Sequence, residues 1–494
     1  MSEAECVVAI DAGTTGVRSR AVFTDGTPTV SAYREFEQHY PQPGWVEHDA
    51  SEIWEAVTST LTQVVDEVGR DRIAAIGITN QRETVVAWDR STGEPHGRAI
   101  VWQDRRTAGR CDELEAAGHL PLVRERTGLV LDPYFSGTKF AWMLENRDIV
   151  VDDDLALGTI DAWLIWNLTG GEVLATDVTN ASRTMLCDIR ERTWDPELCE
   201  ILGVPIDALP EIVASSGRIG VTSDRCGAPA GIPVSGVAGD QQAALFGQAC
   251  IEEGMAKNTY GTGSFVLLNV GETCPEPTEG MLTTVAWTLA DGTTNYALEG
   301  SVFVTGAAIQ WLRDGLGVID DAAETGPLAE SVDDTGGVYV VPAFTGLGSP
   351  HWDPYARGTI VGITRGTGRA QLARAVVESM AYQVRDVIDA MVAASGTPIT
   401  DLRVDGGAAV MDLLCRFQAD QLGVTVQRPV ERETTAAGAA FLAGLAEGVW
   451  ESVDDIASAW VLERSFEPDP DREVADDLHR RWVLAVERSR GWAS

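Results

Sequence analysis

The stretch CVVAIDAGTTGVRSRAVF, residues 6–23, places a turn of small and polar residues between two apolar runs. Cys6–Ile10 predicts a buried strand, and Val17–Phe23 predicts the strand that returns beside it. In the turn Asp11–Gly16, glycines let a ligand approach the backbone and threonines can donate hydrogen bonds to phosphate oxygens. An ordinary hairpin turn explains the same residues, because Asp, Gly and Thr are common in turns.

The chain continues as alternating predicted strands and helices, which is the pattern of an α/β protein. Its 494 residues exceed what one core usually holds, so we expect two or three domains. The pattern places a boundary near Ile251–Gly254, which gives domains at residues 1–250 and 251–494. YGTGS at Tyr260–Ser264 puts a second Gly–Thr turn beside a strand, and this echo indicates two related halves that face one cleft.

The charge of the chain excludes several classes of partner. With 75 acidic and 37 basic residues, the net charge is −38, which argues against nucleic acids and anionic membrane surfaces. No apolar run of about 18 residues predicts a membrane span, and no signal peptide is visible. The eight cysteines have no metal-binding or disulfide spacing. We therefore expect a soluble cytoplasmic protein with reduced thiols.

The stretch GVAGDQQAALFGQ, residues 236–248, carries an acid and two amides at the predicted start of a helix. Asp240 can cap that helix, since its carboxylate accepts hydrogen bonds from the first turn and the helix dipole favours its charge. A second interpretation is catalytic, with Asp240 taking a proton from a substrate hydroxyl. The stretch alone favours capping, because most acids at helix starts are caps.

Two further polar stretches follow predicted strands. TNQRET, residues 79–84, places Arg82 beside Glu83, a pair that can bind several hydroxyls or can lie in a solvated loop. VDGG, residues 404–407, suits the approach of an anionic ligand to a helix start, or a tight turn between strand and helix. Each stretch alone leaves both interpretations open.

Other residues have less specific surroundings. Trp102 and Phe265 could enclose a carbon chain, but lone aromatic residues lie more often in the core. Lys139 is one of only two lysines, the other being Lys257, and we interpret Lys139 as a surface residue. The six histidines are dispersed along the chain, and we interpret all of them as structural.

As an ordered set, the motifs resemble the FGGY family of carbohydrate kinases, and within it most closely the members that act on glycerol. The resemblance spans residues 11 to about 447, and the set is far more specific than any single motif. The motifs are DAGTT (11–15), TNQRET (79–84), WQDRR (102–106), DPYFSGTKFAWML (132–144), GDQQAALFGQ (239–248), KNTYGTGSF (257–265), GAAIQWLRD (306–314), TGLGSPHWDPYARG (345–358) and VDGGAA (404–409).

The resemblance implies an α/β protein of two actin-like, ribonuclease-H-like domains with an interdomain cleft. It implies transfer of the γ-phosphoryl group of ATP to a terminal hydroxyl of glycerol, with Mg²⁺ as cofactor. It also implies a homo-oligomer, a dimer or a tetramer. Phosphoryl transfer needs positioning and charge neutralisation more than covalent help, which is chemistry that these polar motifs can supply.

By matching position, the resemblance implies a role for each residue of the site. Asp240 is implied as the general base and as a ligand of both glycerol and the metal. Asp11 is implied to hold Mg²⁺ through water. The residues implied to bind glycerol are Arg82, Glu83, Trp102, Tyr134, Asp240, Gln241 and Phe265. The residues implied to contact the phosphates and the rest of the nucleotide are Thr14, Thr15, Arg18, Thr262, Gly306, Gln310, Gly407 and Met411.

Four positions depart from the pattern of the members that act on glycerol. Ala12, Gly16 and Val17 stand where those proteins usually carry Gln, Ser and Ser, and Met411 stands where they carry Asn on the adenine side. These departures keep open a kinase for another polyol or ketose, such as erythritol or a pentulose. A third hypothesis is an actin-like scaffold that binds ATP without activity, which the presence of both implied metal carboxylates argues against.

Overall fold

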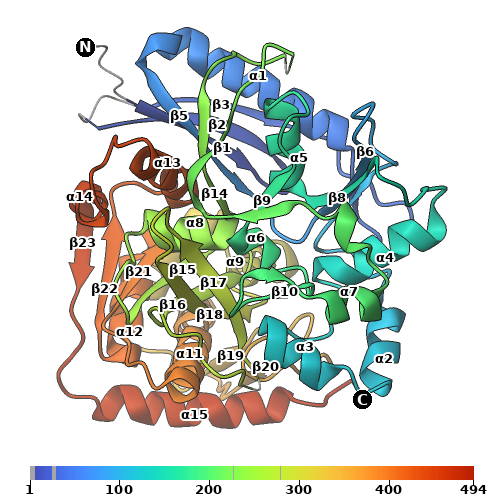
Figure 1. Ribbon diagram of the computed structural model, residues 1–494. Coiled ribbons are helices and arrows are strands. Elements are labelled where there is room, and N and C mark those ends of the chain that lie inside the picture. The colour runs from blue at the N-terminus through green and yellow to red at the C-terminus, as the bar shows by residue number, and fades with distance from the viewer. Residues whose placement is uncertain (1–5, 25–28, 226, 279, 494) are drawn as a thin grey trace.

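The structure, a computed structural model, describes residues 6–24, 29–225, 227–278 and 280–493. Each half of the chain forms one large sheet (Figure 1). The first consists of β1 (Cys6–Ala12), β2 (Gly16–Phe23), β3 (Val30–Glu35), β5 (Ile73–Asn80), β13 (Ser216–Val221) and β14 (Pro233–Gly239). The second consists of β15 (Met255–Tyr260), β16 (Ser264–Asn269), β17 (Leu282–Thr288), β18 (Thr294–Val302), β21 (Asp401–Asp405), β22 (Thr425–Pro429) and β23 (Leu462–Phe466).

The two sheets share one topology. In the first, β1, β2 and β3 form an antiparallel meander, and β5 and then β14 add in parallel on the other side of β1. In the second, β15, β16 and β18 form the meander, and β21 and then β22 add in parallel. The repeated arrangement confirms the expected fold of two actin-like, ribonuclease-H-like α/β domains.

The two Gly–Thr turns occupy the same place in this repeated topology. Residues 13–15 connect β1 to β2, and residues 261–263 connect β15 to β16. The first turn is shorter than expected, because Asp11 still pairs with β2 and β5 as part of β1. The second turn lies between two strands, β15 and β16, where the sequence analysis named one strand beside it.

Smaller sheets and helices surround these cores. One small sheet contains β4 (Glu47–His48), β6 (Val85–Asp89), β7 (Ala99–Ile100) and β8 (Leu155–Thr159). Three strand pairs are β9 (Ala175–Asp177) with β12 (Glu211–Val213), β10 (Cys187–Asp188) with β11 (Thr193–Trp194), and β19 (Tyr339–Val341) with β20 (Thr359–Val361).

The helices divide between the two halves. The first half contains α1 (Ala50–Val68), α2 (Ala108–Ala116), α3 (Leu120–Thr127), α4 (Ser136–Asn146), α5 (Ile160–Leu168), α6 (Val178–Ala181), α7 (Pro196–Leu202) and α8 (Asp240–Gly247). The second half contains α9 (Gly306–Gln310), α10 (Thr325–Glu330), α11 (Arg369–Ser395), α12 (Asp412–Leu422), α13 (Thr434–Ala446), α14 (Val453–Ala459) and α15 (Glu473–Ser489). None of the helices in the described ranges is both long and apolar enough to cross a membrane.

Helix α1 shows how local sequence sets an element and its packing. Asp49 caps it by accepting a hydrogen bond from the N–H of Ser51, and Gly69 ends it with φ 93°. Apolar residues at helical spacing, including Ile53, Val57 and Leu61, are buried on one face. That face covers β2 and β3 of the first sheet.

Helix α13 ties the second half of the chain to the first sheet. It packs against α8 and against β1, β5 and β14, so it lies between the two sheets (Figure 1). Glycines make this close approach possible, since a Cβ on Gly77 of β5 would lie 2.1 Å from the carbonyl oxygen of Ala439. A Cβ on Gly236 of β14 would lie 2.3 Å from the nitrogen of Ala443. The backbone of α13 therefore rests directly on the strands that carry the candidate site.

We expect Gly77→Ala to destabilise the protein by about 1–3 kcal/mol or more, because the added methyl must push α13 away from β5. Gly217→Ala is the matched control, since a Cβ on this strand residue meets no atom within 4 Å. The midpoint of urea unfolding measures both variants. Equal midpoints for the two variants would contradict this account of the α13 contact.

Candidate active site

Three parallel strands of the first sheet bring the candidate residues to one edge. Asp11 lies one residue before the end of β1, Arg82 follows the end of β5, and Asp240 follows the end of β14. Asn80, the last residue of β5, pairs with the last residues of both neighbouring strands, so the three strand ends are level. Ligands of open α/β sheets bind outside the carboxyl ends of strands, which is where these side chains emerge.

Arg82 and Glu83 are buried in an ion network and do not lie in a solvated loop. Arg82 Nη1 donates to Glu299 Oε2 at 2.5 Å, and Nη2 donates to Glu299 Oε1 at 3.1 Å. Arg183 Nη2 donates to Glu299 Oε1 at 2.9 Å, and its Nε donates to Glu83 Oε1 at 2.7 Å. All four side chains are at most 2 % exposed. The network therefore joins the first half of the chain to β18 of the second.

The electrostatics of this network are those of paired buried charges. Burial alone would raise the pKa of Glu299, but Arg183 and Arg82 lower it to about 2. Burial raises the pKa of Glu83, although Arg82 and Arg183 oppose the shift. Glu83 also has a left-handed backbone with φ 60°, a strained conformation that persists only where the surroundings hold it. Such strain on a buried acid at a strand end indicates a functional site.

Asp240 begins α8, and 34 % of its side chain is exposed. Its Oδ1 accepts a hydrogen bond from the N–H of Gln241 at 2.7 Å and lies 3.2 Å from Arg82 Nε. Burial raises the pKa of Asp240 above its ordinary value, although Arg82 and Lys257 oppose the shift. Gly239 is the N-cap of α8, so Asp240 does not cap the helix but contacts its first turn as the first helical residue. The carboxylate remains accessible, so this contact and a catalytic role are compatible.

Lys257 approaches the same region from the second sheet. Its buried Nζ donates to Gln241 Oε1 at 2.5 Å and to Thr259 Oγ1 at 3.2 Å. Burial lowers the pKa of Lys257 to about 8, while nearby carboxylates including Asp240 oppose the shift. Lys257 and Glu299 both pair with Leu267 of β16, so these side chains share one face of the sheet.

Phe265 lies on that same face of the second sheet. It is two residues from Leu267 along β16, and side chains two residues apart in a strand point the same way. Because Glu299 on this face contacts Arg82, the face is turned toward the first half of the chain. Phe265 is half-buried there.

Trp102 and Tyr134 form the aromatic side of the site. Their rings meet edge to face, with centroids 5.7 Å apart. The Tyr134 hydroxyl accepts a hydrogen bond from Arg82 Nη2 at 3.2 Å, and Trp102 Nε1 donates to Thr14 Oγ1 at 3.0 Å. The aromatic pair therefore connects the ion network to the first Gly–Thr turn.

The interpretation of Lys139 as a surface residue is wrong. Its side chain is fully buried on α4, and Nζ donates to the main-chain oxygens of Pro133, Tyr134 and Phe135 at 3.1, 2.6 and 3.0 Å. The physical reason is geometric, since side chains of a helix point toward its N-terminus. The three carbonyls that precede α4 lie in that direction.

The half-buried Gln38, the buried Gln81 and the buried His48 support the first Gly–Thr turn. Gln38 Nε2 donates to the carbonyl of Thr14 at 2.9 Å, and Gln81 Nε2 donates to the carbonyl of Gly13 at 3.1 Å. His48 lies between the amides, with Nε2 2.7 Å from Gln38 Oε1 and Nδ1 3.2 Å from Gln81 Nε2. One pattern satisfies every contact: Nε2–H donates to Gln38, and Nδ1 accepts from Gln81. In a protonated ring, the N–H at Nδ1 would face the N–H of the Gln81 amide, and neither could accept. His48 is therefore neutral.

Three of the four departures from the family pattern are explained by packing inside the first half of the chain. Ala12 and Val17 are fully buried in the apolar core of the first half. Gly16 lies against Tyr33, whose hydroxyl oxygen would be 2.6 Å from an added Cβ. Packing therefore explains these three residues, whereas Thr14 is half-buried and Thr15 is exposed in the turn itself.

Carboxylates crowd the cleft beside the turn. Burial, together with the charges of Asp240 and Glu433, raises the pKa of Asp11 to about 7. Arg18 pairs with Asp11 across β1 and β2 in the strand register, and its guanidinium forms an ion pair with Glu433 just before α13. A cation bound near Asp11 would offset the negative charges that Asp240 and Glu433 place there, and carboxylate oxygens are hard donors that suit Mg²⁺. The chemistry of Asp11 and Asp240 therefore fits a magnesium ion held through water.

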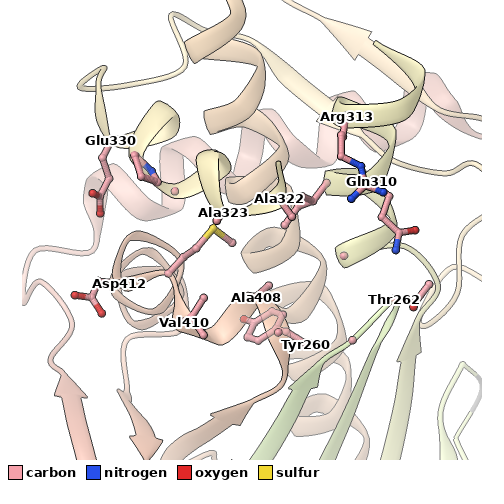
Figure 2. Close-up of a pocket in the computed structure, with 17 residues that line it drawn as sticks. Tyr260, Thr262, Gln310, Arg313, Ala322, Ala323, Glu330, Ala408, Val410 and Asp412 are labelled. Atoms are coloured by element: carbon pink, nitrogen blue, oxygen red, sulfur yellow. The ribbon is translucent and has the colours of Figure 1, made fainter. Parts of the chain in front are cut away.

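A cavity of about 680 Å³ lies in the second half (Figure 2). This volume is within the range of small-molecule and cofactor sites. Figure 2 shows Thr262 and Gln310 toward one end and Glu330 and Asp412 toward the other. Among the residues implied to contact the nucleotide, the cavity is lined by Thr262, Gly306, Gln310, Gly407 and Met411.

Several polar residues of this region were missed by the sequence analysis. Glu299 and Arg183 complete the ion network, Lys257 holds Gln241, and Glu433 holds Arg18. A lone acid within the apolar run YALEGSV signalled Glu299, and the scarcity of lysine signalled Lys257. No local pattern marked Arg183 or Glu433, because their partners lie far away in sequence.

Models of known families match both halves of the chain. The N-terminal domain of the FGGY family of carbohydrate kinases matches residues 6–247, and its C-terminal domain matches residues 256–447. The topology and the matches define a two-domain carbohydrate kinase. The chain belongs to the FGGY family.

Individual relatives match over nearly the whole length. The chain is 54% identical to glycerol kinase 2 of Thermotoga maritima, over 98% of this chain and 99% of the relative. It is 55% identical to a glycerol kinase of Trichlorobacter lovleyi, over 99% of both chains. The crystal structure of Plasmodium falciparum glycerol kinase with ADP superimposes with a TM-score of 0.94 at 35% identity, covering 98% of each chain.

The neutral His48 predicts an acid-sensitive fold. Burial, with a smaller effect of His39, lowers the pKa of His48 from 6.5 to about 3. As pH falls below 6.5 the unfolded chain binds a proton that the folded protein does not, so the free energy of unfolding falls until about pH 3. The slope is up to about 1.4 kcal/mol per pH unit. In urea unfolding from pH 7 to 4, His48→Asn should lose less stability than the wild type; parallel profiles would contradict the neutral assignment.

Proposed function

We propose that this protein transfers the γ-phosphoryl group of ATP to a terminal hydroxyl of glycerol, giving sn-glycerol 3-phosphate for glycerol catabolism. The observation that carries the proposal is the juxtaposition of the partly exposed Asp240 with the buried Arg82–Glu83 pair at one sheet edge. A small polyol needs such a compact set of donors and acceptors. The names of full-length relatives at 54–55% identity support the same substrate.

Each part of the polyol site has a distinct role in the proposal. Arg82 donates to glycerol hydroxyls, while Glu83, which shares Oε1 with Arg183, accepts from them. Tyr134 and Gln241 provide further polar contacts at the rim. Trp102 and Phe265 enclose the carbon chain from the first and second halves of the chain. Side chains fixed in a buried network suit this task, because catalysis depends on the orientation of the attacking hydroxyl.

Asp240 is the proposed general base. Its carboxylate accepts the proton of the attacking hydroxyl while the oxygen bonds to the γ-phosphorus and the bond to ADP breaks. The raised pKa of Asp240 makes it a better proton acceptor than an exposed aspartate. Arg82, at 3.2 Å, keeps the carboxylate oriented before the transfer.

The nucleotide lies between the two Gly–Thr turns in this proposal. Thr14, Thr15 and Arg18 meet the phosphates from the first half, and Thr262 meets them from the second. Gly306, Gln310, Gly407 and Met411 line the cavity for the rest of the nucleotide. Arg18 must exchange Glu433 for a phosphate oxygen, since the two are paired here.

Asp11 and Asp240 are the proposed magnesium residues, with Asp11 acting through water. Mg²⁺ supplies neutralisation of phosphate charge during transfer. Burial raises the pKa of Asp11, and so do the charges of Asp240 and Glu433, which a bound cation would offset. Three further expectations are part of the proposal: a boundary between residues 1–250 and 251–494, which the family matches to residues 6–247 and 256–447 support, a homo-oligomer, and a cytoplasmic location.

A coupled assay of ADP release tests the substrate. We expect Mg-ATP to turn over with glycerol far faster than with erythritol, xylulose, ribulose or no acceptor, at low and at molar salt. The physical reason is that Arg82, Glu83 and Tyr134 form one compact set of donors and acceptors, which suits a short polyol. Preference for another acceptor would replace glycerol while keeping the reaction, and absence of any acceptor-dependent turnover would overturn the kinase proposal.

The role of Asp240 has its own test. Asp240→Asn should lower kcat at least about a hundredfold, because the amide cannot accept the proton. Asp153→Asn, the same change at an exposed acid of the first half, should keep wild-type kcat. Circular dichroism and the unfolding midpoint establish that both variants are folded. Near-wild-type turnover of folded Asp240→Asn would exclude Asp240 as the base.

Asp11 is tested through the magnesium requirement. Asp11→Asn should raise the Mg²⁺ concentration for half-maximal activity at least about tenfold, as is usual when a group that orients metal-bound water is lost. A magnesium titration at saturating glycerol and fixed ATP measures the shift. An unchanged requirement would separate Asp11 from the metal.

A further inference from the structure

The use of lysine in this chain is unusual and leads to the polyol site. Of the 37 lysines and arginines, only Lys139 and Lys257 are lysines, and both side chains are fully buried. Within the described ranges, neither forms an ion pair with a carboxylate; each donates to neutral oxygen atoms. Both also contact residues or segments of the proposed polyol site. Everywhere else this chain uses arginine for a positive charge.

The surroundings of Lys139 explain why arginine does not serve there. Its ammonium group has three donors on one compact nitrogen, and it donates to three successive main-chain oxygens at 2.6–3.1 Å. A guanidinium group is planar and larger, and it cannot direct three hydrogen bonds from one atom. Burial lowers the pKa of Lys139 to about 7, and Glu83, Asp104 and Asp132 oppose this shift. Burying a charge without an ion pair costs free energy. We therefore ask which part of the structure the three hydrogen bonds of Lys139 hold in place.

The segment that Lys139 fixes carries Tyr134. The Tyr134 N–H is held by Asp132 Oδ1 at 2.8 Å, and its carbonyl is held by Lys139 at 2.6 Å. Its ring lies against Trp102, its hydroxyl accepts from Arg82, and the Arg183 guanidinium lies 5.7 Å from the ring centroid. The two main-chain contacts hold the backbone of Tyr134, and the contacts of its ring and hydroxyl place the side chain beside Arg82.

We propose that Lys139 is a positioning residue of the polyol site, which fixes the Pro133–Phe135 segment and thereby the Tyr134 hydroxyl beside Arg82. The inference rests on the proposed function, because Tyr134 is assigned there to the polyol. Lys139 itself touches neither substrate. It acts only through the main chain of its neighbours.

The test compares Lys139→Met and Lys139→Arg with Phe140→Leu. Phe140 is the adjacent buried residue of α4, and it packs into the apolar core away from the carbonyls. Both lysine variants should raise the KM for glycerol at least about tenfold while the KM for ATP stays within about twofold. Phe140→Leu should lower the unfolding midpoint without changing either KM. An unchanged glycerol KM in a folded Lys139→Met variant, or rescue by Lys139→Arg, overturns the proposal.

A double-mutant cycle separates positioning from general stability. In a Tyr134→Ala background, Lys139→Met should have little further effect on the glycerol KM, because the residue it positions is gone. Additive effects would contradict the proposal. Lys139→Gln, which keeps two donors, replaces Lys139→Met in the cycle if the latter does not fold.

Amide hydrogen exchange keeps this test independent of the substrate. Exchange in the peptide that covers residues 131–136 should be faster in Lys139→Met than in the wild type and in Phe140→Leu. If the wild type acts on another polyol, the KM comparison uses that polyol. In that case glycerol is wrong as the substrate, but the proposal for Lys139 is still tested. If exchange at 131–136 is unchanged, the proposal for Lys139 fails even when glycerol is phosphorylated.

Discussion

The ion pair between Arg82 and Glu299 is the contact on which the site depends. The two residues are 217 positions apart in sequence, and they join the end of β5 in the first half to β18 in the second. Two buried charges are costly to desolvate, and only close pairing with further hydrogen bonds offsets that cost. Arg183 donates one such bond to Glu299, and Gln242 accepts one from Arg82. Because Arg82 also contacts Asp240 and Tyr134, the same guanidinium that joins the halves sets the positions of the groups proposed to bind the substrate.

Apolar contacts and close backbone packing support this electrostatic junction. Helix α13 belongs to the second half of the chain but rests on the first sheet, where glycines on β5 and β14 leave room for its backbone. Rigid packing at this point holds the strand ends that carry Arg82 and Asp240 level with each other. The ion pair between Arg18 and Glu433 is weaker than these buried contacts. It is substantially exposed, and exposed ion pairs contribute little to stability.

Much of the architecture could be predicted from the sequence because it depends on local patterns. Apolar runs and Gly–Thr turns predicted β1, β2 and the repeated half, and the structure confirms two domains of one topology. The surface interpretation of Lys139 failed because lysine is usually solvated, and no local pattern shows that three carbonyls precede it in space. Glu299 and Arg183 were missed for a related reason: their roles come from partners in other segments. Burial of the Arg82–Glu83 pair also required both halves to be in place.

The sequence by itself determined the fold class, the family and the residue types at the sheet edge, since these follow from short motifs in a fixed order. It also determined which residues lie within a few positions of a strand end, because strand polarity and register follow from the alternation of elements. Only the tertiary structure decided which of these residues are buried, which charges are paired and which lysine holds which loop. The physical reason is that ion pairing and burial depend on distance in space, and the partners of Arg82, Lys139 and Lys257 are chosen by the packing of whole sheets and helices.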